Sequence, residues 1–127
     1  MNFFCKWLFL LLVSHSAFGH GENTPGPHQG YIRMPGAFHT EVIPQKNGIK
    51  VMLLDINFKN PMTSNSSVKA IIQNAGGEQS FTCKARKNYF FCPIALRLLL
   101  QKGTLQVLAK RKNIPGAPAD YPLPLTR

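Results

Sequence analysis

Three of the four histidines, His20, His28 and His39, lie within one short stretch and are the side chains best suited to hold a metal ion. Imidazole nitrogen is a favoured ligand for copper, nickel and zinc. If the chain is cut before His20, its free amine and its imidazole can chelate one metal together. The amine titrates at about pH 8 and so can release its proton to a metal near neutrality. One further imidazole from His28 or His39 would complete a three-nitrogen site suited to Cu(II).

Two nearby side chains could support such a site. The carboxylate of Glu41 could act as a weak ligand or orient an imidazole, and the thioether of Met34 could serve Cu(I), although a single methionine is more often part of the packing. The alternative interpretation involves no metal. His28 is then a solvated loop residue, and His39 is a polar residue of a sheet that bonds to Glu41 or to the backbone.

The start of the chain predicts export. Residues 1–19 have the pattern of a secretory signal peptide: Lys6 gives a positive charge, residues 7–13 are apolar, and residues 17–19 form a small-x-small cleavage site. The apolar run is too short to span a bilayer comfortably, which disfavours an uncleaved anchor. We therefore expect a periplasmic or secreted protein whose first residue is His20.

The predicted cleavage also removes Cys5 and leaves Cys83 and Cys92. Two cysteines in an exported chain are best interpreted as one disulfide, here across a hairpin. A thiolate pair that binds a soft metal is the alternative, and the wide spacing and the lack of any other thiol disfavour it.

Strand-length apolar runs separated by turn residues predict an all-β domain. The expected strands cover residues 37–43, 49–56, 68–73, 79–85, 89–92 and 105–109. About six or seven such strands indicate a small antiparallel β-sandwich or Greek-key barrel, Ig-like in its architecture.

The remaining segments divide the chain. Residues 20–36 form a Pro/Gly-rich N-terminal arm, residues 37–113 the β domain, and residues 114–127 a Pro-rich extended tail. Residues 93–103 fit a strand or a short helix, and we favour the strand because the neighbouring segments are strands.

The positive charge is unevenly distributed. The net charge of the whole chain is +10, and residues 79–119 hold eight basic and no acidic side chains. Six of the basic residues form two groups at predicted strand ends: Lys84, Arg86, Lys87, Lys110, Arg111 and Lys112. They are either solvated loop tips or a surface for an acidic protein or an anionic membrane. Nucleic acid is not expected to be a partner of an exported protein.

Three short stretches carry a resemblance to a known class of protein: Gly-Pro-His-Gln-Gly at 26–30, Gly-Ala-Phe-His-Thr-Glu-Val at 36–42, and Val-Met-Leu-Leu-Asp at 51–55. They resemble small periplasmic domains associated with bacterial copper and heavy-metal efflux. The resemblance covers roughly the first half of the chain after the signal peptide and implies a β-rich domain that handles metals.

The resemblance assigns roles to His28, His39 and Glu41 alone. Gln29 stands where those domains usually have a glycine, which puts the local turn in doubt. A terminal His20 is also similar to the copper-binding terminus of copper-resistance C proteins, whose site includes a later histidine. This sequence has no histidine after His39, so the complete site of those proteins is absent.

Together, these patterns predict an exported, non-catalytic metal-binding protein that serves metal tolerance or efflux, with copper as the expected metal and His20, His28, His39 and Glu41 as its site. No phosphate-binding glycine loop, H-E-x-x-H, G-x-S-x-G or Cys-x-x-Cys motif is present, and we expect no enzymatic activity. The alternative is a basic interaction module that binds an acidic protein or a membrane surface without metal.

Overall fold

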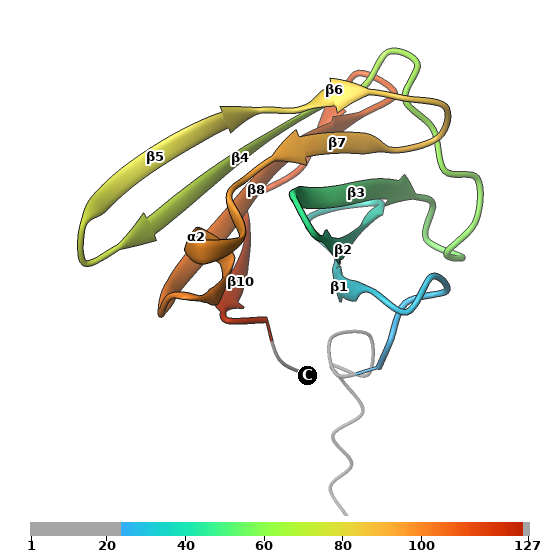
Figure 1. Ribbon diagram of the computed structural model, residues 1–127. Helices are drawn as coiled ribbons and strands as arrows, with labels where there is room; N and C mark the ends of the chain where they lie inside the picture. Colours follow the sequence, from blue (N-terminus) through green and yellow to red (C-terminus); the bar gives the residue numbers. More distant parts are fainter. Residues whose placement is uncertain (1–23, 126–127) are drawn as a thin grey trace, which may run out of the picture.

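The protein is an antiparallel β-sandwich, as Figure 1 shows. The computed structural model describes residues 24–125; the predicted signal peptide, His20 and residues 126–127 lie outside this range. One sheet has the strand order β1-β2-β3-β7-β6, and the other has the order β10-β8-β4-β5, with β9 paired to β8. The prediction of an all-β sandwich is confirmed.

The strands are short, and consecutive ones are mostly joined by tight turns. The first sheet contains β1 (Tyr31–Arg33), β2 (His39–Gln45), β3 (Gly48–Leu54), β7 (Phe90–Pro93) and β6 (Lys84–Ala85). The second contains β10 (Ala119–Leu123), β8 (Gly103–Arg111), β4 (Ser67–Asn74), β5 (Gly77–Thr82) and β9 (Ile114–Pro115). Among residues 24–125, no helix is long and apolar enough to cross a membrane.

Alternation along the strands builds the core between the two sheets. On β4, for example, Val68, Ala70 and Ile72 are buried, while the residues between them are more exposed. This period of two is what a sheet with one packed face requires. Two polar side chains also meet in the core: the hydroxyl groups of Thr40 on β2 and Tyr121 on β10 of the other sheet are hydrogen-bonded, 2.6 Å apart.

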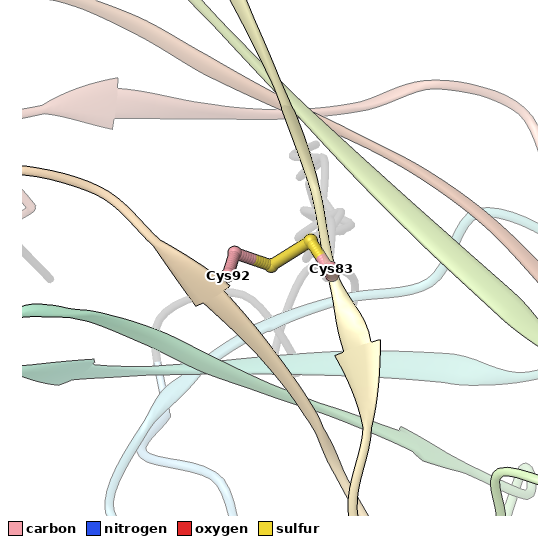
Figure 2. The surroundings of a disulfide bond; sticks show 2 residues. All are labelled: Cys83 and Cys92. Carbon is pink, nitrogen blue, oxygen red and sulfur yellow. A yellow bond between two sulfur atoms is a disulfide. The ribbon is translucent and has the colours of Figure 1, made fainter.

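The disulfide links the point where the chain passes from one sheet to the other with strand β7. Cys83 lies where the chain passes from β5 to β6, and Cys92 lies on β7; Figure 2 shows the two side chains bonded. The predicted pairing is confirmed. It is compatible with export, because such bonds persist in oxidising compartments.

The preference for a strand over residues 93–103 was wrong. The chain forms the helix α2 (Leu96–Leu100) and enters β8 only at Gly103. The adjacent residues Leu98 and Leu99 are both buried. A strand would send two adjacent side chains to opposite faces, whereas one turn of helix can direct both toward the core.

The segment 114–127 is not a simple extended tail, because it contains β9 and β10. Ala119, Tyr121 and Leu123 alternate into the core, and β10 forms an edge of its sheet. Pro122 is exposed on this edge strand, a position where a missing backbone N–H is tolerated. The predicted N-terminal arm likewise contains the short strand β1, so the structure has more strands than the six or seven expected.

Candidate functional site

The candidate site lies on the face of β2 that is turned away from the core. Thr40 and Val42 point inward, so His39 and Glu41 share the opposite face of the strand. The Glu41 side chain is completely buried. A carboxylate with no exposure needs several hydrogen-bond donors around it, because desolvating an ionised group without partners is very costly.

The segment from Gly26 to Gly30 folds over that carboxylate. The turn is closed by hydrogen bonds from Gly26 N to Gly30 O (3.0 Å) and from Gln29 N to Gly26 O (2.9 Å). Gln29 has a φ of 66°, the left-handed region. A Cβ at Gly26 would overlap the Glu41 carboxylate, and one at Gly30 would lie 2.7 Å from the Val42 carbonyl oxygen. Both glycines are therefore needed for the loop to approach β2.

The loop supplies three hydrogen bonds to Glu41. The backbone N–H groups of His28 and Gly30 both donate to Oε2, each at 2.8 Å, and Nδ1 of the His28 ring lies 2.8 Å from Oε1. Because an ionised carboxylate only accepts, Nδ1 is the donor in this contact. In a neutral ring, Nε2 then keeps its lone pair, and the His28 side chain is 43% exposed. A carboxylate bonded to one ring nitrogen is the usual support for a histidine that binds metal through the other.

His39 has a different environment. Its Nδ1 lies 3.1 Å from the backbone oxygen of Asp55, and its ring stacks on Phe58 with centroids 3.9 Å apart and planes inclined by 16°. A carbonyl oxygen only accepts, so Nδ1 again carries the proton. His39 is buried, with only 5% of the residue exposed, and Phe58 is at the protein surface. These contacts fix the ring in place.

The loop that carries Phe58 is organised by the Asp55 carboxylate. Its Oδ1 accepts from the backbone N–H groups of Lys59 and Asn57, both at 2.9 Å, and its Oδ2 accepts from the Asn60 side chain at 2.6 Å. These bonds, above all the one from Lys59, lower the pKa of Asp55 despite some desolvation. Phe58 and Asn60 both have positive φ values, so the carboxylate stabilises a sharply turned backbone.

The structure thus brings His28 and Glu41 into contact and places His39 two residues from Glu41 on the same face of β2. His20 lies outside the described residues. Within residues 24–125, no three His, Cys, Asp or Glu side chains are grouped so that they could hold a metal ion. A metal at His28 would need ligands from the preceding segment or from solvent.

Sequence reasoning missed two parts of this region. The spacing Gly-x-x-x-Gly around His28 is the signal for a loop that must lie close to another backbone, and the two glycines make the turn that Gln29 had put in doubt. No sequence pattern predicts the stacking of Phe58 on His39, because this contact depends on the left-handed turn after β3. Comparisons of the chain with protein-family models, curated proteins and solved structures give no significant match.

Proposed function

We propose that this protein is an exported, non-catalytic copper-binding protein that uses Nε2 of His28 as one ligand. The observation that carries the proposal is the contact between His28 Nδ1 and the buried Glu41 carboxylate, with the imidazole side chain partly open to solvent. This arrangement supports a ligand whose tautomer and orientation are fixed before the metal arrives.

The remaining ligands are proposed to come from His20. If the signal peptide is removed after Gly19, the terminal amine and the imidazole of His20 chelate Cu(II), and His28 adds a third nitrogen. His28 lies eight positions further along the chain, and the proposal requires the terminus to reach it. In this proposal His39 stays a structural residue under Phe58, and Glu41 positions His28 and does not bind metal itself.

The test is a calorimetric titration of the protein beginning at His20 with Cu(II), accompanied by electron paramagnetic resonance of the complex. We expect one Cu(II) per chain with nitrogen ligands. His28→Ala should weaken binding by at least about tenfold, the size of effect typical of a lost ligand or its support. Gln29→Gly, which keeps the left-handed turn in the same loop, is the matched control and should bind like the wild type.

A second variant tests whether the terminal amine of His20 binds copper. Adding one glycine before His20 keeps every side chain but removes the terminal chelate, so it should weaken binding as strongly as His28→Ala. No heat above that of buffer for the wild type, or equal affinity for the wild type and His28→Ala, would refute the proposal.

A further inference from the structure

One end of the sandwich gathers three segments that are distant in the sequence. The connection from β3 to β4, residues 55–66, runs around this end in Figure 1. Its Thr63 hydroxyl lies 3.5 Å from the backbone oxygen of Arg86 in the β6–β7 turn, and its Asn65 oxygen accepts from the N–H of Asn113 in the β8–β9 turn at 2.7 Å. The two basic groups noted in the sequence therefore flank the same loop.

The loop is fastened to the sheets by a basic side chain. The guanidinium of Arg111 donates to the backbone oxygens of Leu53 (3.3 Å) and Asn60 (2.6 Å). Lys112 and Asn113 have φ values of 52° and 65°, as expected for a tight two-residue hairpin turn. These contacts hold the exposed cations of the neighbouring turns on a defined surface instead of on loose loops.

We define the basic end as the exposed cations in these three segments and at the adjoining end of β8: Lys59, Arg86, Lys87, Lys110 and Lys112. Asp55 is the only acidic residue in the three segments, and its carboxylate oxygens accept hydrogen bonds within its own loop. No ion pair links an acidic side chain to any of these five cations among residues 24–125. The basic end therefore presents positive charge that an external anion can approach.

Exposed apolar side chains lie close to Lys59 and Lys112 in the sequence. Ile56 and Phe58 of the β3–β4 connection are 54% and 36% exposed, and Ile114 beside the β8–β9 turn is 58% exposed. They make up three of the six large hydrophobic side chains that are exposed in the described part of the chain. Loop tips that combine aliphatic side chains with lysine and arginine suit the boundary between lipid headgroups and acyl chains.

We propose that the basic end docks on an anionic lipid bilayer, with its cations against the headgroup phosphates and Ile56 and Ile114 in the interfacial layer. An acidic protein would be attracted by the cations alone and would not need the apolar tips. The proposal is independent of copper binding, because it uses neither His20 nor His28.

The test is sedimentation of the protein with vesicles of phosphatidylglycerol and phosphatidylcholine, compared with vesicles of phosphatidylcholine alone. We expect binding only to the anionic vesicles, weakening as salt is added. Each cation near an anionic surface contributes about fivefold in affinity, the equivalent of ~1 kcal/mol. The triple variant R86Q/K87Q/K112N should therefore lose at least tenfold.

A matched control removes three exposed cations at the other end of the sandwich, in K46Q/R97Q/K102Q. It changes the net charge equally and should bind within about twofold of the wild type; an equal loss in both triple variants would overturn the proposal. I56S/I114S should also weaken vesicle binding. Full vesicle binding by this variant, with tight binding of wild type to polyglutamate, would overturn it in favour of an acidic protein. Thermal unfolding followed by circular dichroism checks that every variant is folded.

Discussion

Replacing Glu41 by alanine removes a carboxylate oxygen that accepts hydrogen bonds from two backbone N–H groups. Those of His28 and Gly30 both donate to Oε2, and the Gly30 contact is buried. A buried group left without its partner costs about 1–3 kcal/mol. The His28 ring can turn to solvent, so the loss of its hydrogen bond adds little to the destabilisation. We therefore expect Glu41→Ala to lower the free energy of unfolding by ~3 kcal/mol.

Urea unfolding followed by circular dichroism measures this loss. With a slope of about 1.5 kcal/mol per molar urea, the midpoint should fall by about 2 M. Glu41→Gln is the control for shape: its amide oxygen can still accept from both N–H groups, but the charge is lost, and we expect ~1–2 kcal/mol. If the free energy of unfolding of Glu41→Ala lies within about 0.5 kcal/mol of the wild-type value, the hydrogen bonds of the loop to this carboxylate do not stabilise the fold.

Two further predictions concern the crossing between the sheets and the turn after β3. Replacing Cys83 and Cys92 together by alanine should lower the free energy of unfolding by ~2–3 kcal/mol, because the bond closes a short loop in the unfolded chain; an unchanged urea midpoint would contradict this. The lowered pKa of Asp55 means that its ionised form stabilises the native state. The advantage of the wild type over Asp55→Asn should therefore be present above the ordinary carboxyl pKa and disappear as the pH falls through the lowered value. An advantage that persists in acid, measured by thermal unfolding across this range, would show that the carboxylate is not what holds the turn.

The sandwich could be predicted from the sequence because turn-forming residues separate the apolar runs that form its strands. The β2–β3 hairpin is the clearest case: two apolar runs flank the turn residues Lys46 and Asn47, and the observed strands end within about two residues of the expected limits. The disulfide could also be predicted, because the inference required only the predicted hairpin and the predicted export signal. These are local signals, and tertiary contacts did not override them.

The predictions were wrong where tertiary contacts determine the secondary structure. Residues 114–127 have too many prolines to suggest a strand, yet Tyr121 fills a core position and bonds to Thr40 across the sandwich. At α2, burial of Leu98 and Leu99 against the core selects one helical turn, although the local sequence permits a strand. Neither β10 nor α2 follows from the secondary-structure propensity of its own residues. Predicting them would have required knowledge of which strands pack against them in the core.

At the candidate site, the structure brings His28 and Glu41 into contact, but the kind of contact between them was not predicted. Nothing in the spacing of His28 and Glu41 distinguishes a shared metal from a direct hydrogen bond, and the observed bond serves both interpretations. It satisfies a buried carboxylate, which is a structural role, and it leaves the opposite ring nitrogen toward solvent, which is what a ligand requires. The two roles separate by experiment: stability depends on Glu41 as the acceptor, whereas copper affinity depends on His28 as the ligand. His28→Ala should therefore affect metal binding far more than folding, while Glu41→Ala should affect both.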